Sequence, residues 1–326
     1  MLDQFGRTID YMRISLTDRC NLCCKYCMPE TGVEQLGRKD MLSYEEIIRL
    51  AKIFAGLGIK KIKLTGGEPL IKLNICHLIA ELKSIPQIEQ VTITTNGILL
   101  PKMAKDLISA GIDGFNISLD TLDREKFHQL TRHDQLSNVI QGIDTLLALN
   151  CENIKINCVP IEEVNKDQLV AIAGFAQKHP ISVRFIELMP IGMAHDFTAI
   201  EKTTIVSMLQ KKYGKSFPWS GHLGNGPATY YSFPRFKGKI GFIEAMHNKF
   251  CTTCNRIRLT ANGFLKLCLQ YDKGVDLKDL LRNQKNDEDI RAVIEQNIYK
   301  KPQEHHFNDD SVVEGQDLRK MFQVGG

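Results

Sequence analysis

The feature that most restricts the possible folds of this chain is a regular alternation of short apolar strands and amphipathic helices in the first 190 of its 326 residues. Helical patterns separate most of the strands, as at 43–57, where Ser43 is a good N-cap and Gly58 ends the apolar repeat. Six segments have the length and composition of strands, at residues 12–16, 60–64, 90–94, 114–118, 153–159 and 181–187. Such alternation favours a parallel sheet. We therefore predict an α/β fold, a partial (βα)6 barrel of TIM type, with its chemistry at the C-terminal ends of the strands.

The alternation stops after residue 190. Residues 200–211 and 275–299 have helical patterns, and residues 214–227 form a glycine-rich loop. Short strand-like runs occupy 229–233, 240–243, 256–260 and 264–267. We divide the chain into a barrel domain, 1–211, and a C-terminal α+β region, 212–326. The glycine spacing in 214–227 follows no strand and opens no helix, so it does not predict a nucleotide-binding loop.

Four cysteines lie within eight residues directly after the first strand. Cys20, Cys24 and Cys27 have the spacing C-x3-C-x2-C, and we interpret Cys23 as a non-ligand. A [4Fe–4S] cluster normally takes four thiolates, so three ligands leave one iron open, and an open metal position serves catalysis rather than structure. A structural zinc site is the alternative. Zinc sites usually close with a further Cys or His nearby, whereas the nearest histidine here is His77.

A second cysteine group lies near the other end of the chain. Cys251, Cys254 and Cys268 have the spacing C-x2-C-x13-C, again without a fourth ligand. We expect a second [4Fe–4S] cluster with an open iron, and a structural zinc site is again the alternative. Arg256 and Arg258 follow directly, and guanidinium groups suit phosphate recognition through bidentate hydrogen bonds.

Composition limits the surroundings in which the chain works. Ten cysteines without a signal-peptide pattern indicate a reducing compartment, so we expect a cytoplasmic protein. No apolar run approaches the roughly 20 residues that span a bilayer, so we expect no membrane contact. The net charge of +4 is too small to predict nucleic-acid binding, but it is compatible with a small polyanionic substrate.

The first cysteine group, with Tyr26 before its last ligand, resembles the radical S-adenosylmethionine (SAM) superfamily. The resemblance implies that the open iron chelates SAM and that the reduced cluster cleaves SAM to a 5′-deoxyadenosyl radical. It implies a radical SAM type of barrel, with Glu68 accepting a hydrogen bond from the SAM amino group. The positions that match the SAM contacts of that superfamily are Tyr26, Gly67, Ser118 and Met189.

The whole chain resembles, more narrowly, the GTP 3′,8-cyclase family of molybdenum-cofactor (molybdopterin) biosynthesis. The resemblance rests on the second cysteine group with its Asn-Arg-Ile-Arg sequence, on the terminal Gly-Gly, and on segments 63–69, 94–97, 116–120 and 184–190. It implies the cyclisation of GTP to (8S)-3′,8-cyclo-7,8-dihydroguanosine 5′-triphosphate, the first step of that pathway. It also implies two clusters that face each other across a barrel mouth, with the open iron of the second meeting the guanine.

This resemblance assigns roles to further residues. The positions that match GTP contacts are Arg13, Lys63, Thr94, Lys155, Arg256, Ile257 and Arg258, and we expect the first four at or near strand ends. Lysine at position 63 keeps the charge but lacks the guanidinium fork, so we expect weaker triphosphate binding than arginine would give. Arg256 and Arg258 are implied to act in catalysis, together with a flexible tail, Gly325-Gly326, that enters the site.

The resemblance also implies partners: a reduced donor of flavodoxin or ferredoxin type, a downstream cyclic pyranopterin monophosphate synthase, and a second copy in a homodimer. Two alternatives remain open. One is another radical SAM enzyme, such as a peptide-modifying one with an auxiliary cluster. The other is a non-catalytic iron–sulfur or zinc protein that binds RNA or a protein partner.

Overall fold

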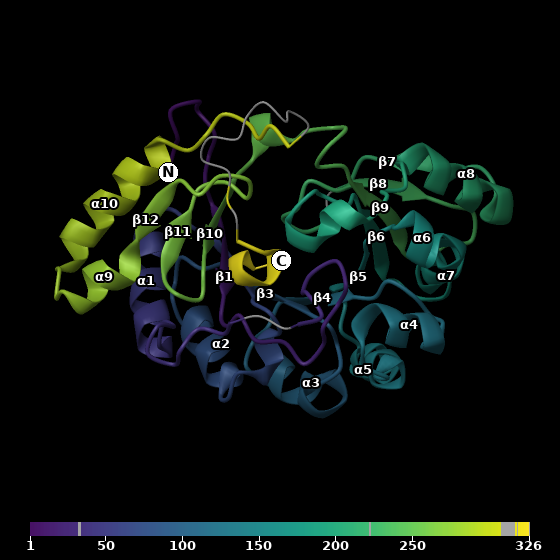
Figure 1. Cartoon of the computed structure of the whole chain (residues 1–326), viewed down its shortest axis with the longest axis horizontal. Coiled ribbons are helices and arrows are strands. Elements are labelled where there is room, and N and C mark those ends of the chain that lie inside the picture. Colours follow the sequence, from purple (N-terminus) through teal and green to yellow (C-terminus); the bar gives the residue numbers. More distant parts are fainter. Residues whose placement is uncertain (32–33, 222, 308–316, 318, 326) are drawn as a thin grey trace.

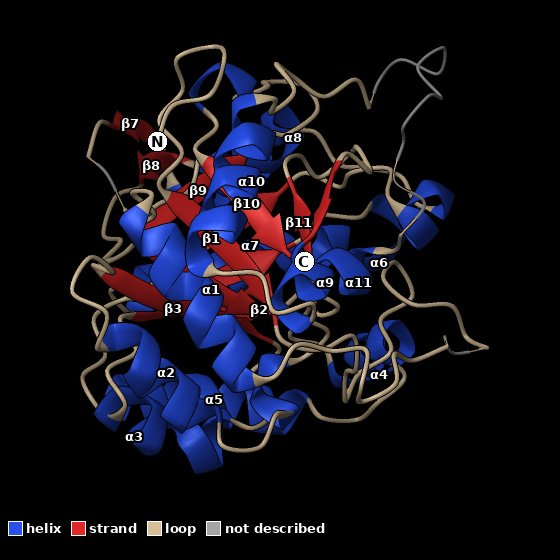
Figure 2. Cartoon of the chain, turned by 90° about the vertical axis from the view of Figure 1, so that its left-hand side faces the viewer, coloured by secondary structure: helices blue, strands red, loops and turns tan. Residues whose placement is uncertain are grey.

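One sheet runs through the whole molecule. The structure is a computed structural model, and it describes residues 1–31, 34–221, 223–307, 317 and 319–325. The strands of this part of the chain form a single twelve-stranded sheet in the order β12-β11-β10-β1-β2-β3-β4-β5-β6-β9-β8-β7. The sheet bends into an open arc with helices on its outer side (Figures 1 and 2).

Eight neighbouring strands of the sheet are parallel, and the pairs at its two edges are antiparallel. The parallel strands are β1 (Tyr11–Ser15), β2 (Lys61–Thr65), β3 (Gln90–Thr95), β4 (Gly114–Ser118), β5 (Ile154–Cys158), β6 (Ser182–Ile186), β9 (Lys239–Ile243) and β10 (Arg256–Leu259). The remaining strands are β7 (Phe217–Trp219), β8 (Thr229–Ser232), β11 (Phe264–Lys266) and β12 (Gly274–Asp276). The six predicted strands are confirmed as β1 to β6, each within one residue at both ends.

The C-terminal region adds strands to both edges of this sheet. Strand β9 pairs with β6, and β10 pairs with β1, both in parallel. The part of the chain after residue 211 therefore continues the barrel on both sides. The boundary between 211 and 212 stays a prediction.

The helices cover the outer face. They are α1 (Tyr44–Gly56), α2 (Ile75–Lys83), α3 (Leu100–Ser109), α4 (Arg124–Thr131), α5 (Leu136–Ala148), α6 (Glu162–Asn165), α7 (Leu169–Lys178), α8 (Lys202–Tyr213), α9 (Leu277–Arg282) and α10 (Asp287–Tyr299). A further helix, α11 (Met321–Val324), lies inside the arc. Ser43 forms the predicted cap of α1, as a capping box with Glu46. The helical pattern at 275–299 corresponds to two helices, α9 and α10, because Asn286 caps a new helix; β12 precedes α9.

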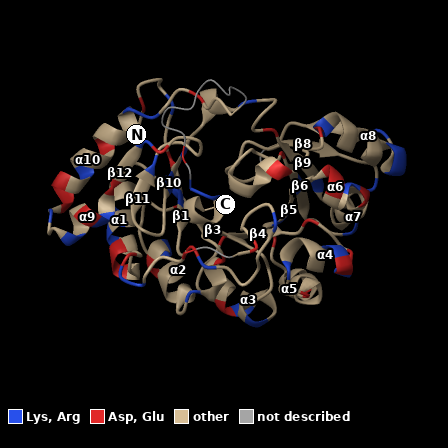
Figure 3. Ribbon diagram, in the orientation of Figure 1, with Lys and Arg blue, Asp and Glu red and all other residues tan. Residues whose placement is uncertain are grey.

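Strand alternation separates an apolar outer face from a polar inner one. In β1, Met12 and Ile14 belong to the core beneath the helices, while Arg13 lies on the other face. Acidic and basic residues are interspersed along outer helices such as α9 and α10 (Figure 3). Among the described residues, no helix has the length and apolar character that a bilayer crossing requires.

Candidate active site

Four neighbouring strands place a row of cations on the inner face of the arc. Arg258, Arg13 and Lys63 are register partners on β10, β1 and β2. Lys266 on β11 is paired with Arg258 and extends the row by one strand. Because adjacent strands lie about 4.8 Å apart, the four cations follow one another closely. We call Lys266, Arg258, Arg13 and Lys63 the cation row.

Ile257 lies between two of these arginines in the sequence but on the opposite face of β10. Its side chain is 1% exposed and belongs to the core beneath the helices. A substrate contact at this position is therefore available only to the backbone. The resemblance assigns the contact to Ile257 without saying which atoms make it, and the fold limits that choice.

The inner face carries strong positive charge. Burial, together with the charges of Arg184, Arg13, Lys155 and Arg256, lowers the pKa of Lys63 well below its usual value. Burial and Arg184 lower the pKa of Lys155 to about 8. None of the ion pairs formed by the described residues includes Lys63, Lys155 or Arg184. Because like charges held close together are destabilising, this face is built to receive an anion.

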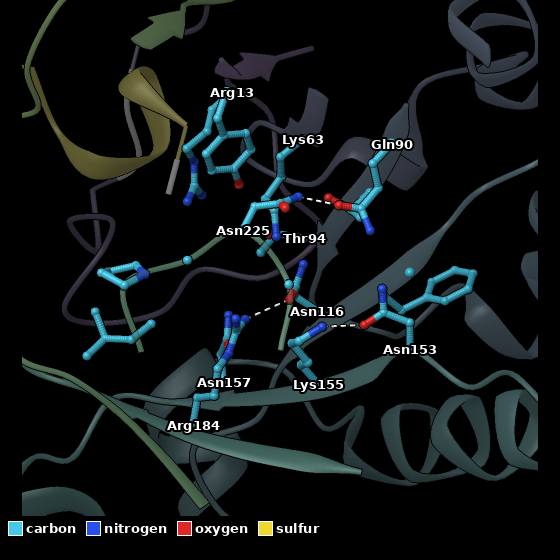
Figure 4. A pocket seen from close by; sticks show the side chains of 18 of the residues that line it. Arg13, Lys63, Gln90, Thr94, Asn116, Asn153, Lys155, Asn157, Arg184 and Asn225 are labelled. Atoms are coloured by element: carbon cyan, nitrogen blue, oxygen red, sulfur yellow. Dashed lines mark hydrogen bonds between the residues drawn. The ribbon is translucent and has the colours of Figure 1, made fainter. Parts of the chain in front are cut away.

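Amide side chains hold the cations of the opposite wall in place (Figure 4). Arg184 Nε donates to Asn157 Oδ1 at 2.9 Å, and its Nη2 donates to Asn116 Oδ1 at 2.6 Å. Lys155 Nζ donates to Asn153 Oδ1. These neutral acceptors orient the cations without cancelling their charge. No sequence motif singles out these asparagines, although they occupy alternate positions of predicted strands, where a barrel interior must be lined.

The two walls line a cavity with about 620 Å³ of unfilled space, its open mouth included. Residues 224–227 of the glycine-rich loop line it. A Cβ on Gly224 would lie 3.2 Å from Lys155 Nζ, and Asn225 Nδ2 donates to Gln90 Oε1 (Figure 4). The loop lines the cavity although its local sequence does not resemble a nucleotide-binding loop.

Four of the implied GTP-contact positions were expected at or near strand ends, and this expectation is wrong for two of them. Arg13 and Lys63 are the central residues of β1 and β2, while Lys155 and Thr94 each lie one residue from an end of their strands. The cavity therefore extends along the strands into the arc. In a closed barrel this space is filled by side chains, whereas here the arc is open.

The first cysteine group lies in the loop after β1, tight against the backbone that follows β2. The Gly67 N–H donates to the Thr17 carbonyl at 2.6 Å, and the Glu68 N–H donates to the Arg19 carbonyl at 2.7 Å. A Cβ on Gly67 would lie only 2.2 Å from the Arg19 oxygen. We expect the bare glycine backbone to admit SAM, but in the structure it accommodates the cysteine loop itself.

Glu68 is buried, and its carboxylate already accepts hydrogen bonds from within the protein. Its carboxylate accepts hydrogen bonds from Leu70 N at 3.0 Å, Thr95 Oγ1 at 2.7 Å and Asn96 N at 2.7 Å. Burial raises the pKa of Glu68 to about 7. These contacts join the loop after β2 to the end of β3, so they occupy the carboxylate that we expect to meet the SAM amino group.

The thiols of the first group are close enough to influence one another. Burial, followed by repulsion from Cys27 and Cys20, raises the pKa of Cys24 well above its usual value. Burial raises the pKa of Cys20 to about 11 and that of Cys27 to about 12. Bound iron reverses this preference, because a coordinating thiol is deprotonated. Three half-buried thiols close together in one loop therefore fit a cluster with one open iron.

Cys23, the fourth thiol of this loop, has a different partner. Arg132 Nη1 donates to the Cys23 carbonyl at 2.8 Å and lies 3.2 Å from its Sγ. This contact supports the interpretation of Cys23 as a non-ligand. Among the described residues, no three Cys, His, Asp or Glu side chains converge as ligands of a single metal ion do. A cluster spreads its thiolates more widely, because each binds a different iron.

The four positions implied for SAM lie at one end of the parallel strands. Tyr26 belongs to the loop after β1, Gly67 follows β2, Ser118 is the last residue of β4, and Met189 follows β6. Parallel strands end at the same edge of a sheet, so these residues share the end of the arc at which the first cysteine group lies.

The second cysteine group lies at the other end of the strands. Cys251 and Cys254 precede β10, which runs parallel to β1, and the Tyr11 N–H donates to the Asn255 carbonyl at 3.2 Å. Strand β1, about 13 Å long at about 3.3 Å per step, runs between the two groups. The expectation of two clusters facing each other across one barrel mouth is therefore wrong. They flank the cavity from its two ends.

Buried cations surround the second group. Burial raises the pKa of Cys254, but Lys301 and Arg256 outweigh this effect and lower it to about 7. Arg7 Nη1 donates to the Cys251 carbonyl at 2.8 Å. The thiols of Cys251, Cys254 and Cys268 interact with one another. This donor set again fits a cluster held by three thiolates.

The C-terminal segment enters the arc, where helix α11 is drawn in yellow (Figure 1). Phe322 and Val324 are buried, and the Gly325 carbonyl accepts a hydrogen bond from Arg258 Nη1. A Cβ on Gly325 would lie 2.5 Å from Thr65 Oγ1, and the residue has a φ of +78°, so glycine suits the position twice over. Gly326, implied to act with Gly325, lies outside the described residues.

Comparisons with known proteins match this arrangement over the full chain. The family described as "Radical SAM superfamily" matches residues 14–176, and "Molybdenum Cofactor Synthesis C" matches residues 181–307. A curated protein of Clostridium perfringens named GTP 3′,8-cyclase is 43% identical over 100% of both chains, and one of Syntrophomonas wolfei with the same name is 45% identical over 100% of both. The crystal structure of Streptococcus suis SuiB bound to precursor peptide SuiA has a TM-score of 0.60 and 15% identity, over 98% of this chain and 76% of that one. That likeness shows the fold alone.

The chain belongs to the radical SAM superfamily, in accordance with its partial barrel and its first cysteine group. Within that superfamily it belongs to the GTP 3′,8-cyclase family, whose members begin molybdenum-cofactor biosynthesis.

Proposed function

We propose that this chain cyclises GTP to (8S)-3′,8-cyclo-7,8-dihydroguanosine 5′-triphosphate with two [4Fe–4S] clusters. Cys20, Cys24 and Cys27 would hold one cluster, and the second would be held by Cys251, Cys254 and Cys268. The observation that carries the proposal is the position of the two groups at opposite ends of strands whose side chains line one cationic cavity. When bound, the first cluster delivers the electron that activates SAM, and the second offers an open iron to the guanine.

The protein contributes charge, position and exclusion of water. Arg13, Lys63 and Arg258 on one wall, and Lys155 and Arg184 on the other, would bind a triphosphate of charge near −4. Asparagine side chains fix the direction of the Arg184 and Lys155 donors. A hydrogen-abstracting group reacts with whatever lies nearest, so the ribose has to be held in place before SAM is activated. Arg256 would act with Arg258 in catalysis.

Tyr26, Gly67, Ser118 and Met189 would contact SAM, and Gly325 and Gly326 would act with Arg256 and Arg258 in the reaction. Thr94 and the backbone of Ile257 would complete the GTP contacts. These assignments are supported by the shared end of the strands and by the position of Gly325 against Thr65.

Partners follow from the chemistry. The reaction needs a strongly reducing electron source, so we propose a flavodoxin or ferredoxin type of donor, and a cyclic pyranopterin monophosphate synthase as consumer of the product. We further propose a homodimer and a cytoplasmic location. The location is supported by ten cysteines without a disulfide among the described residues.

The decisive experiment is an anaerobic incubation of the reconstituted chain with SAM, dithionite and GTP. We expect 5′-deoxyadenosine and cyclised GTP to form together, and about eight irons per chain, four for each cluster. A chain that binds zinc, or forms neither product, would overturn the proposal in favour of a binding protein. A chain that cleaves SAM only with a peptide substrate would point to a peptide-modifying enzyme.

Matched cysteine variants test the second cluster separately. Cys268→Ala should lose about four irons per chain and the ability to form cyclised GTP. Cys151→Ala removes a partly exposed thiol outside both groups and should keep all the iron. Equal iron contents in the two variants would contradict a cluster at Cys268.

A further inference from the structure

Lys266, the end member of the cation row, already has an acidic partner within the protein. Lys266 is fully buried, with 0% of its side chain exposed. Its Nζ forms an ion pair with Asp317 and donates to the Tyr271 carbonyl at 2.8 Å. Asp317 is itself only 5% exposed. Arg13 and Lys63 line the cavity, whereas Lys266 and Arg258 both contact the C-terminal segment.

Asp317 is held from several sides at once. Its carboxylate also accepts from Arg319 Nε at 2.9 Å and from the Arg319 N–H at 2.8 Å. Its own N–H donates to the Gln270 carbonyl at 2.7 Å, and the Arg319 guanidinium lies 4.6 Å from the centre of the Phe264 ring. A buried carboxylate with this many donors is a fixed point from which the chain continues to α11.

The two ends of this segment are bound by neighbouring residues of one strand pair. Lys266 binds Asp317, and Arg258, its direct partner across β10 and β11, binds the Gly325 carbonyl. Between them Phe322 and Val324 pack into the interior. The position of Gly325 against Ser15 and Thr65 is therefore set by a contact eight residues away in the chain.

We propose that Lys266, Asp317 and Arg319 form a latch that positions the C-terminal segment in the cavity, with Asp317 as its positioning residue. The attraction is electrostatic: the cation row presents a buried positive end, and Asp317 is the carboxylate that neutralises it. Removing that carboxylate takes the ion-pair partner from Lys266 and the acceptor from Arg319, so the segment loses its fixed point on β11. That the segment matters for cyclisation rests on the proposed function. That the latch anchors the segment does not depend on the proposed function.

Hydrogen exchange of the reconstituted chain tests the anchoring independently of activity. In Asp317→Asn we expect amides of 321–325 to exchange at least about tenfold faster than in the parent chain. Glu304→Gln is the matched control, because its ion pair with Lys249 is exposed and contributes little; its exchange should not change. Unchanged protection in Asp317→Asn would overturn the latch, whether or not the parent chain cyclises GTP.

Activity then tests the positioning role. We expect Asp317→Asn to keep its iron and its GTP affinity and to form at least about tenfold less cyclised GTP. Faster exchange with full product formation would overturn the positioning role. If Asp317→Asn fails to take up iron, Arg319→Gln serves instead, because it leaves the Lys266–Asp317 pair intact; its exchange should increase by a smaller factor, and no increase would again overturn the latch.

Discussion

The Tyr26 hydroxyl donates a 2.7 Å hydrogen bond to Oδ2 of Asp120, which joins the first cysteine loop to the end of β4. Asp120 Oδ1 accepts from the Val159 N–H at 2.8 Å, and the Asp120 carbonyl accepts from Asn165 Nδ2 at 2.9 Å. Burial raises the pKa of Asp120 to about 6. One carboxylate therefore fixes the cysteine loop to two neighbouring strand ends.

Tyr26→Phe should loosen that loop while keeping the aromatic ring. It removes a hydrogen bond and leaves a buried carboxylate oxygen with one donor fewer, at a cost of about 1–3 kcal/mol. We expect a chelator to remove the first four irons several-fold faster and the other four at the parent rate. Tyr44→Phe is the control, because Tyr44 donates to the Leu73 carbonyl at 2.9 Å in an exposed position. Identical iron release from both variants would contradict a role for the Asp120 contact.

Gly67→Ala should prevent the cysteine loop from packing against β2. Its Cβ would lie 2.2 Å from the Arg19 backbone oxygen, which cannot move aside without the loop. We expect about four irons per chain to be lost, with the second cluster retained. Gly56→Ala is the matched control, because a Cβ there meets nothing within 4 Å and alanine favours a helix by about 0.5–1 kcal/mol. Iron analysis with electron paramagnetic resonance distinguishes the two clusters.

Local signals predicted the elements well. Ser43 capped its helix as expected, and six strands appeared where apolar runs were bounded by turn residues. The attachment of β9 and β10 to opposite edges was not predictable, because pairing between residues as distant as Arg13 and Arg258 leaves no local pattern. The division of residues 275–299 into two helices could have been predicted, since Asn286 followed by acidic residues is a recognisable helix start.

Some features of the candidate site could likewise be predicted from the sequence, and others could not. The cysteine spacings and the clustered cations were visible in the sequence, but Asn116, Asn153 and Asn157 were not singled out. A signal was present: polar residues alternate with apolar ones along strands that must be covered by helices on one side. Gly67 and Glu68 also pack loops against each other, and this second role could not be predicted because it depends on tertiary structure.

Arg184→Lys should weaken GTP binding although it keeps the charge. Two hydrogen-bond acceptors, on Asn116 and Asn157, hold the guanidinium from two directions, and an ammonium lacks the planar fork that meets both. We expect about a tenfold loss of GTP affinity, equivalent to about 1.4 kcal/mol, measured by calorimetry on the reconstituted chain. Arg124→Lys is the control, because its pair with Asp134 is on the surface. Equal affinities in the two variants would argue against Arg184 as a phosphate ligand.

Lys155 should make GTP binding depend on pH in the alkaline range. Burial and the charge of Arg184 lower its pKa from 10.5 to about 8, so it is mostly an ammonium at pH 7 and mostly a neutral amine at pH 9. A terminal phosphate, with a pKa of about 6, is fully ionised across this range. Because the triphosphate favours the protonated amine, binding must take up a proton above the pKa of the free protein. The dissociation constant should therefore rise as the pH passes 8, by at most about tenfold per pH unit for one proton.

Lys155→Arg separates this effect from the titration of other groups. A guanidinium has a pKa above about 12, so position 155 stays charged from about pH 7 to about pH 9, and the rise in the dissociation constant should be smaller than in the parent chain. Calorimetry in two buffers of different ionisation enthalpy measures the proton uptake directly. The parent chain should take up close to one proton more at pH 9 than the variant does. Equal uptake by the two chains would mean that Lys155 does not contact the phosphates, and that Lys63 or the thiols cause any remaining pH dependence.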